Sequence, residues 1–436
     1  MQTESLLPAP GTPPIAADEA VRLVEEIPMA HMVEPPESSS TDSVVIFPIA
    51  AVAPSAIPTA LRSETSWPIQ ITSSAFKVIA TFLHGSFGVA SMIAGLSILA
   101  SIPILNLLSL GYLLEVSGRV AKSGKISDAL VGIHKASRVG SIVFCAWLAI
   151  LPARFLGGFW YDAYLLEPGT PQERRLWIAT AIVGAITAAY IFWAWVRGGR
   201  FRDFLWPAPI RFLKTFFSGK LWNDAANGCW NFVVSLRLPY YFSLGFRGFV
   251  GTTAWLILPI GLFIAASKSA PIPAGFFNFF GAVTMSMVLI YLPFAQANFA
   301  AENKLRAMFQ ISAIRDLFRR APIFFWIAML FTVALALPLY LAKIEYIPRE
   351  LLFLPGILFI SFSFPARALT GWAMGFARLR NKPRFFLFRW ASRLGMIPIA
   401  LIYVMVLYFS QYTSWTGVYS LFEQHAFLVP APFVSN

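Results

Sequence analysis

Long apolar stretches, separated by shorter segments rich in lysine and arginine, dominate the chain from about residue 76 onward. A helix needs roughly 20 apolar residues to cross a hydrocarbon core about 30 Å thick. The stretches that approach this length, and are predicted to be transmembrane helices, are 77–98, 102–118, 139–160, 176–196, 248–267, 277–297, 322–341, 351–374 and 395–413. The pattern therefore predicts an all-α, polytopic transmembrane helix bundle of about nine spans, within a range of eight to ten.

Two apolar segments leave the number of spans open. A single straight helix over 77–118 would be far longer than the bilayer is thick, at 1.5 Å per residue. We expect a break near Ser101 and a tight helical hairpin, with one bent span as the alternative. The segment 228–246 is interrupted by Arg237 and Pro239. We expect it to lie at the cytoplasmic interface, with a further span as the alternative.

Composition supports a membrane location for this bundle. Hydrophobic residues make up 57% of the chain and charged residues only 13%, whereas soluble domains carry about 25% charge. The 41 phenylalanines and 14 tryptophans fit helices that end in aromatic belts at the membrane surface. Because no soluble core of this size could cover so much apolar surface, we predict a multi-pass protein of the cell membrane, of the bacterial inner-membrane type.

Basic residues are distributed unevenly among the connections, and this distribution predicts the topology. The connections 117–138, 197–247, 298–321 and 375–394 together hold 24 lysines and arginines, whereas the intervening connections hold five. Positive residues accumulate on the cytoplasmic side of membrane proteins. We therefore predict a cytoplasmic N-terminus and an extracytoplasmic C-terminus.

The ends of the chain differ from its apolar middle. Residues 1–74 hold nine acidic and two basic residues and are rich in proline, serine and alanine. They contain too few large apolar side chains to offset the entropy cost of ordering, so a disordered, acidic cytoplasmic tail is expected. This tail is either a solvated segment or an arm that recruits partners. Residues 75–415 form the predicted transmembrane helical domain, and 416–436 a short extracytoplasmic tail.

Two of the basic connections, 207–222 and 303–320, show the spacing of amphipathic helices. In the first, one predicted face is apolar and consists of Ile210, Leu213, Phe216 and Phe217. Arg211 and Lys214 lie on the opposite, polar face. Basic amphipathic helices lie in the headgroup plane and bind anionic lipid, so Arg211 and Lys214 are candidate lipid contacts. The simpler interpretation is a cytoplasmic linker whose charges only set the topology.

Two arginines lie within apolar segments and are candidate anion contacts. Arg154 and Arg367 share the sequence Pro-Ala-Arg-x-Leu-x-Gly. Charged residues inside the membrane commonly mark a functional site, and related positions on repeated helices form binding sites in transporters. The simpler interpretation is a chance similarity, with each arginine extending its charge toward the nearer membrane surface.

Small residues and prolines predict how the helices pack. Gly371 and Gly375 have the GxxxG spacing that allows two helices to approach closely. Single matches to this spacing are frequent in apolar segments, so the pair predicts nothing about oligomers. Prolines in or beside the apolar segments predict kinks or broken helices.

No pattern of catalytic, cofactor-binding or metal-ligating residues is recognisable in the sequence. Gly124-Lys125 resembles the end of a phosphate-binding loop but lacks the earlier glycine and the following Ser or Thr. The four histidines are scattered, and His84 is expected to hydrogen-bond a neighbouring helix. We therefore expect no catalytic residue, no cofactor, no metal and no enzyme activity. No nucleic-acid partner is expected either, because the bases lie between apolar segments.

One stretch of the chain resembles known families. Residues 111–125 read GYLLEVSGRVAKSGK. An apolar hairpin ending in Gly111-Tyr112-Leu113, followed by basic residues and a short amphipathic helix, resembles uncharacterised multi-pass membrane protein families of bacteria and archaea, of the domain-of-unknown-function type. The resemblance covers residues 102–138. The chain also shows a weaker internal similarity, between Ile311-Ser312 followed by Arg319 and Ile126-Ser127 followed by Arg138. Because these families have no established activity, the resemblance implies the architecture and no site residue.

The functional prediction follows from this class of protein. Transport or lipid handling without catalysis fits a bundle with kinked helices, interfacial basic helices and a few buried charges. The alternative is a membrane scaffold or assembly factor that recruits partners through the acidic tail. The expected partners are membrane lipids, with anionic headgroups as the candidates, and protein partners are left open.

Overall fold

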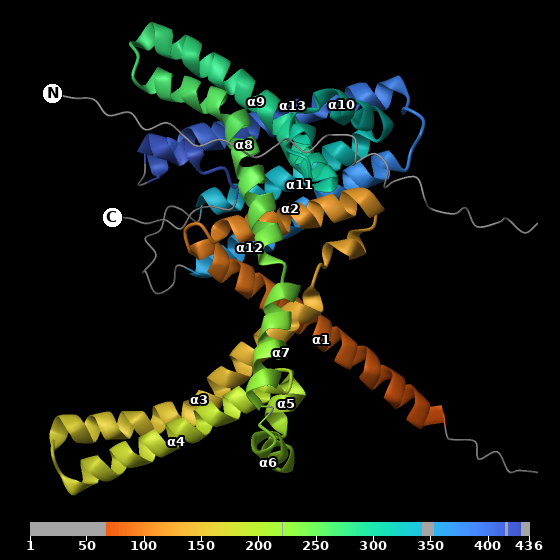
Figure 1. Cartoon of the computed structure of the whole chain (residues 1–436). Helices are drawn as coiled ribbons and strands as arrows, with labels where there is room; N and C mark the ends of the chain where they lie inside the picture. The colour runs from red at the N-terminus through yellow and green to blue at the C-terminus, as the bar shows by residue number, and fades with distance from the viewer. Residues whose placement is uncertain (1–66, 220, 342–352, 415–416, 429–436) are drawn as a thin grey trace, which may run out of the picture. The chain divides into compact units, whose positions relative to one another are not determined.

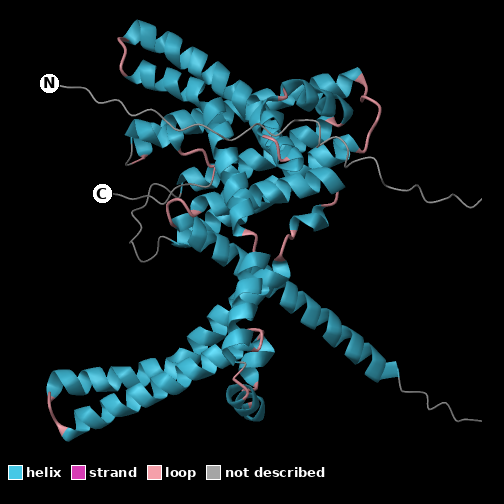
Figure 2. Cartoon of the chain, in the orientation of Figure 1, coloured by secondary structure: helices cyan, strands magenta, loops and turns pink. Residues whose placement is uncertain are grey.

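The computed structural model describes residues 67–219, 221–341, 353–414 and 417–428, and every regular element in this part is helical (Figures 1 and 2). The helices are α1 (Trp67–Ser101), α2 (Asn106–Ser123), α3 (Ile133–Leu166), α4 (Pro171–Val196), α5 (Phe201–Leu205), α6 (Pro209–Phe217), α7 (Leu221–Ser235), α8 (Leu238–Ser267), α9 (Pro271–Glu302), α10 (Ile311–Arg320), α11 (Pro322–Leu341), α12 (Phe353–Arg378) and α13 (Phe386–Thr413). Short 3₁₀ helices are η1 (Ile126–Ala129), η2 (Leu305–Phe309) and η4 (Gly417–Phe422). Helix α1 begins inside the predicted tail 1–74, whose first 66 residues lie outside the described part.

Eight helical segments of the described chain are long and apolar enough to cross a membrane. They are Thr81–Ser101, Ile133–Leu166, Pro171–Val196, Ala225–Ser267, Pro271–Glu302, Pro322–Tyr340, Leu354–Arg378 and Phe386–Thr413. This confirms the predicted all-α, multi-pass architecture of eight to ten spans. The predicted span 102–118 is not among them, because α2 carries Glu115, Arg119 and Lys122 and is less apolar than the helices that form the candidate spans.

Helix α2 lies in the core of the bundle. The break expected near Ser101 is present, since α1 ends there and α2 begins at Asn106. However, α2 contacts α8, α9 and α12 more extensively than it contacts α1. Its side chains Leu113, Leu114 and Val116 are at most 1% exposed. Neighbouring helices therefore cover most of this segment, including Glu115, whereas Arg119 and Lys122 are exposed.

Glycines allow other helices to pack closely against α2. A Cβ atom added at Gly245 of α8 would collide with the carbonyl oxygen of Leu107. On α12, a Cβ at Gly371 would collide with the Ser117 carbonyl, and one at Gly375 would lie 2.6 Å from the carbonyl oxygen of Val120. The GxxxG pair therefore serves close packing within the chain, at the α2–α12 contact.

The segment around 228–246 is broken where the sequence predicts an interruption. Arg237 has left-handed backbone angles (φ 54°, ψ 36°) between α7 and α8, and Pro239 follows within the first turn of α8. Proline fits the first turn of a helix, where its missing N–H costs nothing. Apolar character continues across the break in the candidate span Ala225–Ser267. Whether α7 crosses the membrane or lies at its surface stays a prediction.

One backbone motif occurs twice. Helix α2 ends at Gly124 with left-handed angles (φ 72°, ψ 3°), and Lys125 is extended before η1. Helix α9 ends at Asn303 with similar angles (φ 55°, ψ 28°), and Lys304 is extended before η2. The two helices also pack against each other. The two turns therefore align Ile126 with Leu305. The sequence comparison instead aligns Ile126-Ser127 with Ile311-Ser312.

The described C-terminal segment, residues 417–428, packs into the bundle against α8 and α13. Leu421 and Phe427 are fully buried, and the polar residues Ser420, Gln424 and His425 are at most 3% exposed. This segment falls within the predicted tail 416–436. Its buried polar side chains bring hydrogen-bonding groups into an otherwise apolar core.

Candidate functional site

Arg367 is the most deeply buried charged side chain among the residues described, at 5% exposure. It lies near the middle of α12, more than two helical turns from either end. Its side chain is therefore enclosed by neighbouring parts of the chain, whereas the simpler interpretation of the sequence has it extended toward a membrane surface. Pro365, two residues earlier, removes one backbone donor from α12 beside this position.

The partners of Arg367 come from two distant parts of the chain. Nη1 of Arg367 donates to Oε1 of Gln296 on α9, and Nη2 donates to the carbonyl oxygen of Phe427. Gln296 is oriented in turn, because its Nε2 donates to Oγ1 of Thr252 at 2.6 Å and to the same Phe427 carbonyl at 3.1 Å. Three helices and the C-terminal segment therefore converge on one guanidinium.

These partners are all neutral. The three ion pairs within the described part of the chain do not include Arg367. Removing a charge from water costs several kcal/mol even after relaxation, and hydrogen bonds to neutral groups offset only part of that cost. Arg367 therefore provides an uncompensated positive charge inside the bundle, with planar donors suited to a carboxylate or phosphate.

A hydrogen-bonded network continues from Arg367 along the C-terminal segment. The hydroxyls of Tyr340 on α11 and Tyr403 on α13 are 3.0 Å apart, and Tyr403 also donates to Oε1 of Gln424 at 3.0 Å. The ring of His425 packs against those of Tyr340 and Phe359 at centroid distances of 4.3 and 4.8 Å. The polar side of residues 417–428 thus forms one wall of the site.

The other buried charge, Glu115 on α2, contrasts with Arg367 because it is paired. Arg119 Nε lies 2.7 Å from Oε1 of Glu115, as expected from their i,i+4 spacing. The hydroxyl of Tyr240 on α8 donates to Oε2 at 2.7 Å. The hydrogen bond that Arg119 donates to Glu115 raises the pKa of Arg119. This arrangement joins α2 to α8, so its role is structural.

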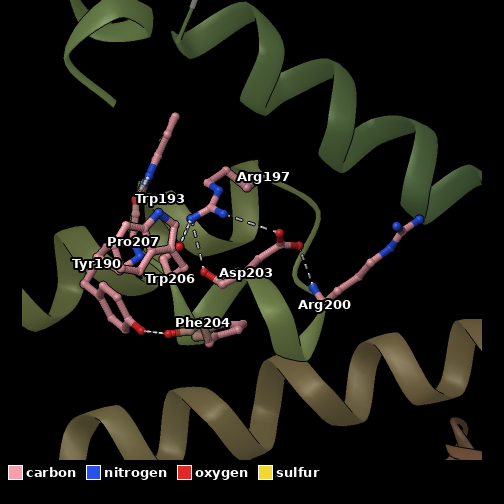
Figure 3. Close-up of polar contacts among 8 residues, drawn as sticks. All are labelled: Tyr190, Trp193, Arg197, Arg200, Asp203, Phe204, Trp206 and Pro207. Carbon is pink, nitrogen blue, oxygen red and sulfur yellow. Dashed lines mark hydrogen bonds and ion pairs between the residues drawn. The ribbon is translucent and has the colours of Figure 1, made fainter. Parts of the chain in front are cut away.

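The basic amphipathic segment is attached to the end of α4 by polar contacts (Figure 3). Arg197 and Asp203 form an ion pair at 3.6 Å, and both side chains are only 13% exposed. Nη1 of Arg197 also donates to the carbonyl oxygens of Asp203, at 3.3 Å, and Trp206. Oδ2 of Asp203 accepts from the backbone N–H of Arg200 at 3.1 Å. The turn that leads from α4 into α5 is therefore fixed.

Two aromatic side chains of α4 extend this attachment (Figure 3). Nε1 of Trp193 donates to the carbonyl oxygen of Pro207 at 2.7 Å, and the hydroxyl of Tyr190 donates to that of Phe204. Helix α6 begins two residues later, at Pro209. These contacts hold the start of α6 beside the end of a candidate span.

Helix α6 exposes both faces that the sequence predicts. Its large apolar side chains are exposed by 53–79% and consist of Ile210, Leu213, Phe216 and Phe217. Arg211 and Lys214, the candidate lipid contacts, are also exposed. A short helix with an uncovered aromatic face and a basic face is typical of an element that lies at a membrane surface.

Replacing Asp203 with alanine is expected to loosen α5 and α6, because the change removes an ion pair shielded from water together with a backbone cap. Amide hydrogen exchange of residues 201–217 should become at least about tenfold faster, as for a local opening that is easier by about 1.4 kcal/mol. Asp316→Ala is the control, since its pair with Arg319 is 50–60% exposed and such pairs contribute little. Equal exchange in both variants would contradict the structural role assigned to Asp203.

The structure separates the two arginines that share a sequence pattern. Arg154 is exposed on α3, whose packing partners are α1, α4 and α5. Arg367 lies on α12, so the pattern does not mark one site.

Sequence reasoning missed Gln296 and the Phe427 carbonyl, since a backbone oxygen gives no signal in a sequence. It also missed that His84 stacks on His134, with ring centroids 6.0 Å apart.

These observations define a multi-pass helical membrane protein with a cationic centre inside its bundle. A family model described as "Protein of unknown function (DUF4013)" matches residues 222–344. Neither the curated proteins nor the solved structures contain a match. The predicted resemblance to a family of the domain-of-unknown-function type is confirmed, but the matched residues lie beyond 102–138, where the sequence suggested it. The match contains Thr252 and Gln296 and ends before Arg367.

Proposed function

We propose that this protein transports or handles an anionic ligand within the membrane, without catalysing a covalent change. The observation that carries the proposal is the guanidinium of Arg367, buried and without a carboxylate partner. A carboxylate or phosphate at this position would make charge-assisted, bidentate hydrogen bonds. Such bonds offset the cost of the buried charge better than two neutral acceptors do. The bacterial inner membrane, with the N-terminus cytoplasmic and the C-terminus outside, is part of the proposal.

The amphipathic helix α6 favours a lipid as the ligand. Arg211 and Lys214 are exposed beside an uncovered aromatic face. Each basic residue near a membrane surface attracts anionic lipid by about 1 kcal/mol. In the predicted topology these residues lie in the cytoplasmic leaflet. Anionic phospholipid would therefore be concentrated around the chain before it reaches the site.

The test is lipid binding by the full chain in a neutral maltoside detergent, with phosphatidylglycerol as the probe and native mass spectrometry as the readout. Arg367→Gln is expected to weaken phosphatidylglycerol binding about tenfold, corresponding to about 1.4 kcal/mol. Arg154→Gln is the matched control, since it removes an exposed arginine from another span and should leave binding as in the parent. Binding by Arg367→Gln equal to that of the parent would rule out the proposed site.

Folding is tested separately, because loss of Arg367 also removes two structural hydrogen bonds. Arg367→Lys keeps the charge but loses the planar pair of donors. We expect this variant to have a thermal midpoint close to that of the parent and an affinity between those of the parent and Arg367→Gln. If the affinity for phosphatidylglycerol falls in parallel with the thermal midpoint across the parent, Arg367→Lys and Arg367→Gln, then Arg367 does not contact the lipid directly.

The alternative function is a membrane scaffold that recruits partners through its acidic tail. It rests on residues 1–74, most of which lie outside the described part of the chain. Deleting them distinguishes the two functions, since a transport or lipid-handling protein keeps its phosphatidylglycerol binding. A scaffold would instead lose a stoichiometric protein partner.

A further inference from the structure

A shallow cavity of about 400 Å³, open to the surroundings, lies between the ends of α3 and α4, beside the turn that joins them. The two helices form an antiparallel pair (Figure 1). Trp160, Tyr164 and Trp177 line the cavity, together with Glu173 and Arg174. Its volume lies within the range of small-molecule sites, about 300–1,000 Å³. Neither the family match nor the site at Arg367 includes these residues.

The walls of the cavity are aromatic. The rings of Trp160 and Tyr164 on α3 have centroids 6.2 Å apart, and Trp177 contributes a third ring from α4. The negative faces of aromatic rings attract cations, and quaternary ammonium groups are bound in this way. Three rings from two helices around one hollow therefore favour a soft, weakly hydrated cation.

Local backbone contacts fix a carboxylate at the edge of this cavity. Oε2 of Glu173 accepts from the backbone N–H of Gly169 at 2.9 Å, and Oγ1 of Thr170 accepts from the backbone N–H of Glu173 at 3.3 Å. Thr170 thus caps the start of α4, and Glu173 binds the backbone N–H of the residue before the cap. Oε1 of Glu173 has no hydrogen-bond or ion-pair partner in the described part of the chain, so it is available to a ligand.

Donors for an anionic group are present at the same cavity. Arg174 lines it and takes part in none of the ion pairs found in the described chain. The indole Nε1 of Trp160 is buried and has no hydrogen-bond acceptor in the described structure. Buried donors without an acceptor are uncommon and costly. The cavity therefore combines an aromatic cation site with the guanidinium of Arg174, which suits a phosphate, and lies beside an indole N–H without an acceptor.

We propose that this cavity binds the zwitterionic headgroup of a phospholipid, with the quaternary ammonium against the three rings and Glu173, and the phosphate near Arg174 and Trp160. The ends of α3 and α4 are the ends of candidate spans, which lie at headgroup depth in a membrane. The exposed apolar side chains of Phe155 and Phe159 offer a surface for the acyl chains. The cavity offers both a carboxylate and a guanidinium, whereas the site at Arg367 offers only a positive charge, so the two sites are distinct.

The experiment uses the full chain in maltoside with an equimolar mixture of phosphatidylcholine and phosphatidylglycerol, and counts retained lipids by native mass spectrometry. Glu173→Gln keeps an oxygen for the Gly169 N–H but removes the charge, and Trp177→Leu removes one ring. Each is expected to reduce phosphatidylcholine retention about tenfold. Trp147→Leu is the matched control, because Trp147 is 51% exposed on α3 and does not line the cavity. It should retain phosphatidylcholine as the parent does.

Two outcomes overturn the proposal. One is equal retention of phosphatidylcholine by the parent, Glu173→Gln and Trp177→Leu, and the other is a loss matched by a lower thermal midpoint in both variants. A further arm adds soluble phosphocholine. If phosphocholine displaces the lipid at a comparable concentration, the cavity does recognise this headgroup chemistry, but its ligand is a soluble compound. If only the lipid binds, the source is the membrane.

Discussion

Replacing Gly245 with alanine is expected to destabilise the protein by about 2 kcal/mol, although the change adds a single methyl group. The added Cβ would collide with the carbonyl oxygen of Leu107, so α8 would have to move away from α2. Because α2 packs simultaneously against α9 and α12, the displacement would disturb the core on several sides. The measurement is the thermal unfolding midpoint of the purified chain in detergent.

Gly261→Ala is the matched control on the same helix. A Cβ at Gly261 meets no atom within 4 Å, and alanine favours helix over glycine by about 1 kcal/mol. We therefore expect an unchanged or slightly higher midpoint. If both alanine variants unfold at the temperature of the parent, α2 and α8 do not pack as closely as the structure shows.

Ending the chain at Ser414 is expected to have a still larger effect, a loss of roughly 4–8 kcal/mol, from the removal of two buried hydrophobic side chains and of hydrogen bonds to a charged group. Leu421 and Phe427 are fully buried, and the Phe427 carbonyl is an acceptor for Arg367. Since domains have only about 5–15 kcal/mol of stability, most of the shortened chain should fail to reach a folded, monodisperse state. Size-exclusion chromatography and the thermal midpoint measure this.

Two further chains separate the contribution of Arg367 from that of packing. A chain ending at Leu428 keeps the carbonyl of Phe427 and should behave as the parent. In the chain ending at Ser414, Arg367→Met removes the charge that has lost its acceptor, and it should recover part of the stability. If it recovers nothing, the carbonyl of Phe427 does not stabilise the buried charge.

The sequence predicts the type of fold and most spans because apolar length is a local property. It correctly places the break near Ser101 and the interruption at Arg237, both of which depend on residues close in the chain. It does not predict that other helices cover 102–118, since hydropathy counts apolar residues and cannot say what surrounds them, and whether this segment crosses the membrane stays a prediction. Membrane orientation depends on charge distribution alone and stays a prediction.

The candidate site is predictable only in part. The charge of Arg367 within an apolar run identifies it as a candidate functional residue. The residue spacing in 207–222 predicts the apolar and the basic face of α6. The acceptors of Arg367 are not predictable, because Gln296 and Phe427 lie far from it in the sequence. Only the folded chain shows that the shared Pro-Ala-Arg pattern places Arg154 on a different, exposed helix.

The repeated turn at Gly124-Lys125 and Asn303-Lys304 has a consequence for the ancestry of the chain. The helices that precede the two turns, α2 and α9, pack against each other, and a Cβ added at Gly118 would lie 2.9 Å from the Cβ of Ala300. A shorter ancestor with one copy of this unit would expose that helix face, and two such chains could bury it by pairing symmetrically. Duplication and fusion would convert this dimer contact into an internal one. Each copy would then be free to change alone, and the two helices do differ today, since α2 carries the paired Glu115 and α9 carries Gln296, a partner of Arg367.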